Sequence, residues 1–403
     1  MTDVLDALQR ATGGHAAVAG EADVAGGVPA KWVAAPGSTE EAAAVLRTAA
    51  AEGLAVAARG AGTKLDWGTP PRRLDLIVDI GRLDRVIEHA AGDLVVIAQA
   101  GVPLRTLGEQ LAEAGQRLAV DEVVPGTTVG GMLATGLSGP RRMLAGAVRD
   151  LVLGVTLVRA DGVVAKAGGK VVKNVAGYDL SKLVCGAYGT LGLVTEANFR
   201  LHPIPPAAAY VTARVPDAAA AYAAVQRMLH GQFVPTAVEL DRPEPGGPVE
   251  IAVLLEGTEA GVTARTAQAV EALGDGAAEG PQPGWWGALP AGDVLVKVTT
   301  ELTGTGRLLD GIEKAAPAAV RGSAGVGVLY ASVAAPDAAG FVLALRDAAP
   351  SWQGSVVMLT APPEVRSEVD SWGPVAGLEL MRKVKDRFDP DALLAPGRFV
   401  GGI

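Results

Sequence analysis

Three glycine-rich segments are the parts of this sequence best suited to chemistry. The first, Arg59–Lys64 (RGAGTK), directly follows the apolar run Leu54–Ala58. Glycines let backbone N–H groups approach an anion closely, and Arg59 and Lys64 add positive charge. The segment therefore predicts contact with a phosphate or a similar anion, and an ordinary turn is the alternative.

The other two segments carry almost no charge. Pro125–Gly136 (PGTTVGGMLATG) combines glycines with hydroxyl side chains, and Gly189–Thr195 (GTLGLVT) leads into an apolar run. None of the three has the G-x-G-x-x-G spacing of a dinucleotide fingerprint or the pattern of a Walker loop. Together they predict a cofactor that is held mainly by backbone amides.

Hydrophobic periodicity predicts the elements that position these segments. Ser38 and Glu41 form a capping box before a helix that ends at Gly53, and Pro103 opens a second helix. Asp161-Gly162 is typical of a hairpin turn. Strands are expected at 31–35, 54–58, 74–80, 94–98, 151–159, 163–167 and 193–201, and a further helix at 178–185.

The second half of the chain has a different organisation. The stiff run His202–Pro206 (HPIPP) predicts a domain boundary. The alternation of strands and helices beyond it favours a largely antiparallel sheet with helices on one face, so the fold class is α+β. The strands are expected at 210–215, 237–240, 251–256, 294–299, 327–333 and 355–359, and the helices near 217–230, 258–273, 306–315 and 337–347.

Composition excludes several classes of function. With 403 residues, 49% of them hydrophobic, the chain can form more than one domain with a sizeable core. A net charge of −9 argues against nucleic-acid binding. The single cysteine, Cys185, excludes an iron–sulfur cluster held by this chain alone, and its apolar neighbours predict an inert thiol. No signal peptide or membrane-spanning run is apparent, so we expect a cytoplasmic protein.

The order of the motifs resembles a known family. The segments at 59–63, 128–136 and 189–196, with the spacing Gly146-x-x-x-Asp150-x-x-x-Gly154, are similar to the FAD-binding domain of the vanillyl-alcohol oxidase / p-cresol methylhydroxylase (PCMH) family. The tail Phe388–Arg398 resembles the family's C-terminal return to that domain. The run 170–180 (KVVKNVAGYDL) is similar to the flavin subunits of bacterial glycolate oxidase, and the chain length fits the smaller, E subunit.

The resemblance implies a two-domain α+β flavoprotein. It has an N-terminal lead-in at 1–27, a PCMH-type FAD-binding domain at 28–205, an α/β cap domain with a mainly antiparallel sheet at 206–375, and a returning tail at 376–403. In this family the first loop surrounds the FAD pyrophosphate, the second segment lines the channel toward the flavin ring, and the third holds the adenine end. The cofactor-binding residues implied are Arg59, Gly60, Ala61, Gly62, Thr63, Lys64, Pro125, Thr128, Val129, Gly130, Gly131, Ala134, Thr135, Gly136, Ser138, Gly139, Gly146, Asp150, Lys173, Gly189, Gly192 and Val194.

Two of these residues have an alternative role that does not involve the cofactor. Asp150 could cap a helix or a turn, and Lys173, like Lys170, could be a solvated charge or lie at an interface. The sequence also departs from the family at informative places. The loops contain no His or Cys that could bond the flavin, so we expect noncovalent FAD. Ala395 stands where the family tail usually has Asn.

The resemblance implies oxidation of a 2-hydroxy acid, glycolate to glyoxylate, by a subunit of a glycolate oxidase-type complex. The expected partners are a larger catalytic FAD-binding subunit and an iron–sulfur subunit, with peripheral membrane association only through the complex. The region 206–375 contains a single histidine, His230, so no catalytic base and no metal site are assigned. A stand-alone FAD-dependent hydroxy-acid or alcohol oxidoreductase and a structural or electron-relay subunit remain the alternatives.

Overall fold

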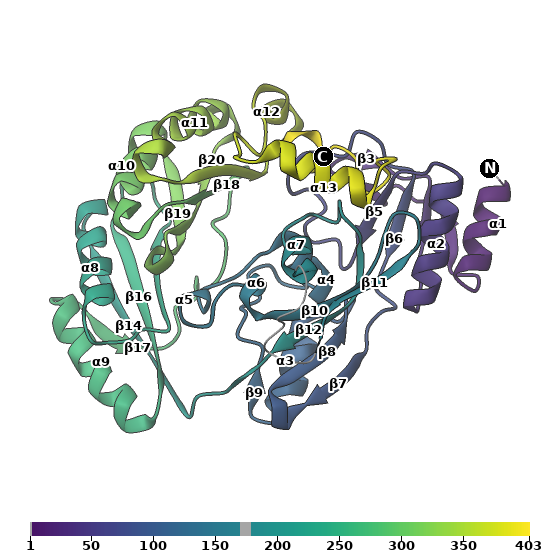
Figure 1. Ribbon diagram of the computed structural model, residues 1–403. Helices are drawn as coiled ribbons and strands as arrows, with labels where there is room; N and C mark the ends of the chain where they lie inside the picture. The colour runs from purple at the N-terminus through teal and green to yellow at the C-terminus, as the bar shows by residue number, and fades with distance from the viewer. Residues whose placement is uncertain (1, 170–178) are drawn as a thin grey trace. The chain divides into compact units, whose positions relative to one another are not determined.

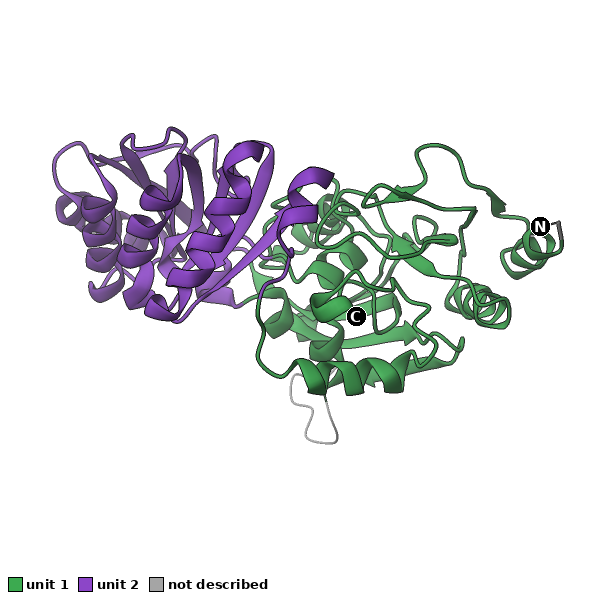
Figure 2. Ribbon diagram, turned by 90° about the horizontal axis from the view of Figure 1, so that it is seen from above, with its two compact units in different colours: residues 1–137, 147–203, 374–403 green, residues 138–146, 204–373 purple. Residues whose placement is uncertain are grey.

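The chain divides into two compact units. The computed structural model describes residues 2–169 and 179–403, so Lys173 and Lys170 lie outside the described residues. Unit 1 comprises residues 1–137, 147–203 and 374–403, and unit 2 comprises residues 138–146 and 204–373 (Figure 2). The short segment 138–146 therefore groups with the second unit, although the chain on both sides of it belongs to the first.

Unit 1 contains the three glycine segments and has two main sheets (Figure 1), besides the two-stranded pairs β2-β3 and β9-β13. Its strands are β1 (Ala16–Val18), β2 (Val24–Ala25), β3 (Val28–Pro29), β4 (Trp32–Ala34), β5 (Val56–Arg59), β6 (Leu76–Asp79), β7 (Val86–Ala90), β8 (Val95–Gln99), β9 (Gln116–Arg117), β10 (Val152–Val158), β11 (Val164–Gly168), β12 (Leu193–Arg200) and β13 (His202–Pro203). Its helices are α1 (Thr2–Ala11), α2 (Thr39–Ala51), α3 (Leu104–Ala112), α4 (Val129–Thr135), α6 (Val148–Leu151), α7 (Leu180–Val184) and α13 (Leu378–Phe388).

The loop at 59–64 begins at the end of β5, a strand of the first sheet. The strand order of this sheet is β1-β4-β6-β5, with β4, β6 and β5 parallel. Half of the expected capping box of α2 is confirmed, because the Ser38 hydroxyl accepts a hydrogen bond from the Glu41 N–H at 3.1 Å. The Glu41 carboxylate accepts from the Gly37 N–H at 2.7 Å and not from the Ser38 N–H. Leu46 of α2 and Leu8 of α1 are buried with Leu76, which holds both helices in one core with this sheet.

The second sheet is antiparallel, in the order β11-β10-β12-β8-β7, and its expected hairpin is confirmed with Gly162 at φ +76°. Strand β7 was not predicted, because its residues are partly exposed and lack an apolar run. Helix α4 was not predicted either, since two glycines lower helix propensity. It forms because Thr128 caps its first turn and Gly136, at φ +60°, ends it.

Unit 2 is built around one eight-stranded antiparallel sheet in the order β17-β14-β16-β15-β19-β20-β18-β21. Its strands are β14 (Ala207–Val215), β15 (Ala237–Arg242), β16 (Val249–Gly257), β17 (Ala278–Gly280), β18 (Val294–Thr299), β19 (Ala318–Ser323), β20 (Val328–Val333) and β21 (Ser355–Thr360). Its helices are α5 (Arg142–Ala145), α8 (Ala218–His230), α9 (Glu259–Leu273), α10 (Thr305–Ala315), α11 (Ala335–Ala348) and α12 (Pro363–Glu368).

The long helices of unit 2 lie on one face of the sheet (Figure 1), as expected. Val238, Val296 and Leu329 from this face are buried with Leu309 of α10 and Phe341 of α11. Strand β19 was not predicted, because its sequence AAVRGS is poor in the residues that favour strands. None of the helices in the described residues is both long and apolar enough to cross a bilayer.

Candidate cofactor site

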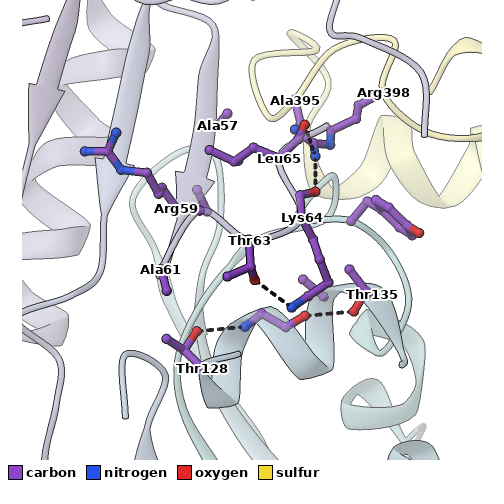
Figure 3. A pocket seen from close by; sticks show the side chains of 17 residues that line it. Ala57, Arg59, Ala61, Thr63, Lys64, Leu65, Thr128, Thr135, Ala395 and Arg398 are labelled. Carbon is purple, nitrogen blue, oxygen red and sulfur yellow. Dashed lines mark hydrogen bonds between the residues drawn. The ribbon is translucent and has the colours of Figure 1, made fainter. Parts of the chain in front are cut away.

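Two adjoining cavities in unit 1 gather the glycine segments. The first is bounded by the loop at 59–64, by α4 and by the C-terminal tail (Figure 3). The second continues along the segment 187–194. The two cavities share the lining residues Ala58, Gly60, Gly131, Ala134 and Gly189, so they form one elongated channel.

The backbone of the loop at 59–64 requires glycine at two positions. Gly62 has φ +75°, a conformation that L side chains rarely adopt. A Cβ atom at Gly60 would lie 2.4 Å from the Thr128 hydroxyl oxygen, so only glycine allows the loop to approach α4 this closely. The loop therefore presents a main-chain surface with few side chains to the channel.

The sequence predicted that Arg59 and Lys64 both add positive charge to this loop, but the structure gives Arg59 two carboxylate partners. The Arg59 guanidinium is within 2.5 Å of an Asp23 carboxylate oxygen and 2.8 Å of an Asp79 oxygen. In Figure 3 the Arg59 side chain points away from Thr63 and Lys64. The charge of Arg59 is therefore neutralised by two carboxylates, and Lys64 supplies the positive charge of the channel.

Lys64 is a buried cation whose partners are neutral. Its Nζ donates hydrogen bonds to the hydroxyl oxygens of Thr127 at 2.7 Å and Thr63 at 3.0 Å, and it makes no ion pair with a described residue. Burial lowers the pKa of Lys64 to about 8, and the more distant Glu122 only partly opposes this. An anion in the channel would supply the missing countercharge.

Helix α4 forms another wall of the channel. Gly131 faces the channel, since a Cβ atom there would lie 3.3 Å from the Thr128 hydroxyl and 3.9 Å from Lys64 Nζ. The neighbouring Gly130 is also a lining residue, but a Cβ atom there would meet Ala100 and Ile80 at 2.9–3.0 Å. Gly131 thus leaves space beside the channel, whereas Gly130 is required by packing against the sheet.

The C-terminal tail closes the first cavity. Val56 of β5 pairs with the tail through hydrogen bonds to Leu393 and Ala395, each of 2.7 Å. The Arg398 guanidinium donates to the carbonyl oxygens of Lys64 at 3.0 Å and Leu65 at 2.7 Å. Ala395 has φ +45°, a left-handed conformation that Asn or Gly adopts more easily. The tail therefore fixes the loop that carries Lys64.

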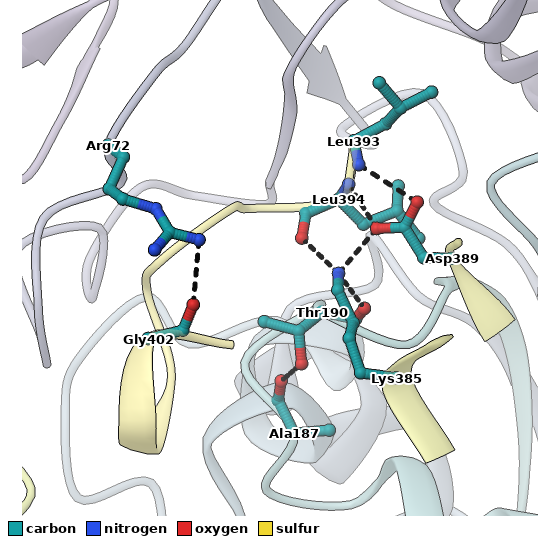
Figure 4. Close-up of polar contacts among 8 residues, drawn as sticks. All are labelled: Arg72, Ala187, Thr190, Lys385, Asp389, Leu393, Leu394 and Gly402. Carbon is teal, nitrogen blue, oxygen red and sulfur yellow. Dashed lines mark hydrogen bonds and ion pairs between the residues drawn. The ribbon is translucent and has the colours of Figure 1, made fainter. Parts of the chain in front are cut away.

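A buried ion pair anchors the tail to the third glycine segment (Figure 4). Lys385 Nζ binds the Asp389 carboxylate and also donates to the carbonyl oxygens of Thr190 at 2.8 Å and Leu394 at 2.9 Å. Asp389 in turn accepts hydrogen bonds from the N–H groups of Leu393 and Leu394. One side chain thus joins α13, the tail and the segment at 189–192.

Replacing Lys385 with methionine is expected to destabilise the protein by about 3–5 kcal/mol, because Asp389 remains as a buried, unpaired carboxylate. Retention of a cofactor in the channel should fall as well, since Thr190 and Leu394 lose a common anchor. Thermal unfolding, followed with and without the cofactor, measures both effects. The exposed Lys383 on the same helix provides the control Lys383→Met, expected within about 0.5 kcal/mol of wild type. Equal melting temperatures for the two variants would contradict this role.

Most of the residues implied from the sequence line the channel, and some do not. The lining residues are Arg59, Gly60, Ala61, Gly62, Thr63, Lys64, Thr128, Gly130, Gly131, Ala134, Thr135, Gly189, Gly192 and Val194. Pro125, Val129, Gly136, Ser138, Gly139, Gly146 and Asp150 are not among the lining residues. Asp150 accepts a hydrogen bond from the Ala147 N–H at 2.9 Å and so caps α6. Lining residues absent from the sequence-based set include Tyr188 and Arg398, which only the tertiary fold brings to the loop.

Comparisons with known proteins indicate which cofactor this chain binds. Residues 30–168 match the model of the FAD binding domain, and residues 370–399 match that of the C-terminal domain of FAD linked oxidases. These two matches cover less than half of the chain, and they show that it contains an FAD-binding domain. Its cofactor is FAD, and the tail described above coincides with the second match.

Sequence relatives come from several oxidoreductases. Glycolate oxidase subunit GlcE of Escherichia coli is 41% identical over 149 residues, covering 36% of this chain and 42% of that protein. D-lactate dehydrogenase of Archaeoglobus fulgidus is 35% identical over 168 residues, covering 42% of this chain and 38% of that protein. The matched regions thus span less than half the length of these relatives. The fold is that of p-cresol methylhydroxylase with substrate bound, at a TM-score of 0.75, 15% identity, and coverage of 98% of this chain and 96% of that one.

The residues present fit FAD. A diphosphate can approach the main chain of the loop at 59–64, and Lys64 provides a buried ammonium group without a carboxylate partner among the described residues. At Gly189, with φ +75°, a Cβ atom would meet no other atom within 4 Å, which leaves open space on this side of the segment. An elongated channel that is lined by Arg59, Lys64 and Arg398, and by no carboxylate among the described residues, suits an extended dinucleotide.

Proposed function

We propose that this protein is an FAD-binding subunit of a glycolate oxidase-type complex that oxidises 2-hydroxy acids, with glycolate as the first candidate substrate. The observation that carries the proposal is the 41% identity to glycolate oxidase subunit GlcE, together with a channel that fits FAD. Relatives named D-lactate dehydrogenase and D-2-hydroxyglutarate dehydrogenase support the same substrate class.

Bound FAD supplies the acceptor for the two electrons and the hydrogen that leave the hydroxyl-bearing carbon of the substrate. In this proposal the loop at 59–64 and Lys64 bind the pyrophosphate. Thr128, Gly131 and Ala134 line the path toward the flavin ring, and the segment at 189–194 holds the adenine end. From the tail, Arg398 holds the first of these segments and Lys385 holds the third.

The proposal includes noncovalent attachment. The segments 59–64, 125–139 and 189–195 contain no histidine or cysteine that could bond the flavin. Burial raises the pKa of Cys185 to about 11, so this thiol is protonated and a poor nucleophile at neutral pH.

The proposed partner subunits are needed to carry electrons away from the flavin and to provide the catalytic site. One cysteine cannot ligate an iron–sulfur cluster, so electrons that leave the flavin by that route need a separate iron–sulfur subunit. A larger FAD-binding subunit is proposed as the second partner, because the described residues of unit 2 offer no cluster of metal-ligating side chains to serve with a base. A stand-alone hydroxy-acid oxidoreductase is the second candidate, supported by the single-chain names of the dehydrogenase relatives.

The test is to purify this chain alone, load it with FAD, and assay glycolate and D-lactate with an artificial dye acceptor. The chain alone is expected to be a poor catalyst, and co-expression with its partner subunits should restore turnover. Turnover at ordinary enzyme rates, about 1–1,000 per second, by the isolated chain would favour the stand-alone oxidoreductase instead.

A further inference from the structure

A row of polar side chains crosses the centre of the unit 2 sheet on the face away from its helices. Cross-strand pairing places Asp241 of β15 opposite Arg321 of β19, Arg321 opposite Tyr330 of β20, and Tyr330 opposite Lys297 of β18. Directly paired side chains on one face of an antiparallel sheet lie about 4.5–5.5 Å apart at Cβ. Polar groups in the middle of an eight-stranded sheet are costly to bury, so their partners matter.

At one end of the row the polar groups have partners, and at the other end, at Tyr330 and Lys297, they have none among the described residues. Arg321 Nε lies 2.7 Å from the Asp241 carboxylate, which completes that pair. The Tyr330 hydroxyl is buried and has no hydrogen-bond partner, and Lys297 forms no hydrogen bond or ion pair with any described residue. The hydroxyl of Ser332, two residues along β20, is also buried and unpartnered.

A second cation joins this end from the segment 138–146. Met143 lies beside Gly325 and packs against the unit 2 core, and Arg141 lies 3.6 Å from the Glu256 carboxylate, which fixes the segment on unit 2. The neighbouring Arg142 has a buried Nε–H without a partner. Burial together with the charge of Arg142 lowers the pKa of Lys297 to about 8, so the two cations are close enough to repel each other.

We propose that Lys297, Arg142 and Tyr330 form a binding site in unit 2 for a small carboxylate that carries a neighbouring hydroxyl group. The ammonium and guanidinium groups hold the carboxylate, and the phenolic hydroxyl binds the ligand's own hydroxyl oxygen. The substrate class rests on the proposed function. The need for an anion rests on two neighbouring cations, Lys297 and Arg142, against one buried carboxylate, Glu239, near Tyr330, and on the unpartnered hydroxyl of Tyr330. Burial raises the pKa of Tyr330, so its hydroxyl stays a hydrogen-bond donor.

The site makes an unusual stability prediction. Lys297 has no partner to lose, so Lys297→Met should leave the melting temperature of the unliganded protein unchanged or raise it. A structural lysine would behave in the opposite way. Lys314, an exposed residue of α10 on the helical side of the same unit, provides the matched control Lys314→Met.

The experiment is calorimetric titration of the FAD-loaded full chain with glycolate, glycolamide and sulfate. Wild type and Lys314→Met should bind glycolate alike, with no comparable binding of the neutral glycolamide or of sulfate. Lys297→Met should bind glycolate at least tenfold more weakly, and Tyr330→Phe, which removes one oxygen atom, about 2- to 10-fold more weakly.

Equal glycolate affinity for Lys297→Met and Lys314→Met would overturn the site, as would a fall in the melting temperature of unliganded Lys297→Met. Tyr330→Phe keeps the test decisive if the lysine variant does not fold. Lys297-dependent glycolate binding in a complex that shows no glycolate oxidation would support the site and contradict the proposed function, so the two failures are distinguishable.

Discussion

Replacing Gly131 with leucine is expected to give a folded protein that no longer holds FAD. A Cβ atom at this position would lie 3.3 Å from the Thr128 hydroxyl and 3.9 Å from Lys64 Nζ, so a larger side chain enters the channel. The φ of Gly131 is not in the left-handed region, and leucine favours helices more than glycine does. The fold should therefore survive while the flavin absorbance of the purified protein is lost.

Gly108 in α3 provides the matched control. It is an exposed helical glycine, and a Cβ atom there would meet no other atom within 4 Å. Gly108→Leu should keep full FAD content and show an unchanged or slightly higher melting temperature. Normal FAD content in Gly131→Leu would show that the cofactor does not occupy this channel.

Replacing Lys64 with methionine is expected to weaken FAD binding by about 10- to 100-fold, the usual contribution of a charged hydrogen bond to a buried anion. The apoprotein should not lose stability, because Lys64 makes no ion pair with a described residue. Titration of apoprotein with FAD, followed by quenching of flavin fluorescence, measures the affinity. The exposed Lys383 of the same unit gives the control Lys383→Met.

The affinity should also depend on pH. Burial lowers the pKa of Lys64 from 10.5 to about 8, and a bound diphosphate favours the charged form of the side chain. FAD affinity should therefore fall as the pH rises above 8, by up to about tenfold for each pH unit. In the apoprotein the sign is opposite, since loss of the Lys64 proton relieves a buried charge and adds stability between pH 8 and 10.5. An affinity that does not change between pH 7 and 9.5, or that changes equally in Lys64→Met, would contradict this role.

Local chemistry explains which features the sequence could predict. The cap at Ser38, the hairpin at Gly162 and the helices on one face of the unit 2 sheet depend on neighbouring residues or simple periodicity, and all are confirmed. The glycine segments were recognisable for the same reason, because few other residues allow a main chain to approach a ligand so closely.

Features set by distant residues could not be predicted. The ion pairs of Arg59 depend on Asp23 and Asp79, which lie 36 and 20 residues away in the sequence. Lys385 reaches Thr190 across 195 residues, and the i,i+4 spacing of Lys385 and Asp389 in the sequence does not reveal this contact. Helix α4 formed despite its glycines because tertiary packing against Ala100 and Ile80 outweighs propensity.

The most direct test of this account is the visible absorption spectrum of the purified chain before and after acid precipitation. The account predicts a flavin spectrum with FAD equimolar to the protein, and complete release of the yellow colour into the supernatant. Protein that takes up no FAD on incubation, or flavin fluorescence that stays with the denatured chain on a gel, would contradict noncovalent binding of FAD in the glycine-lined channel.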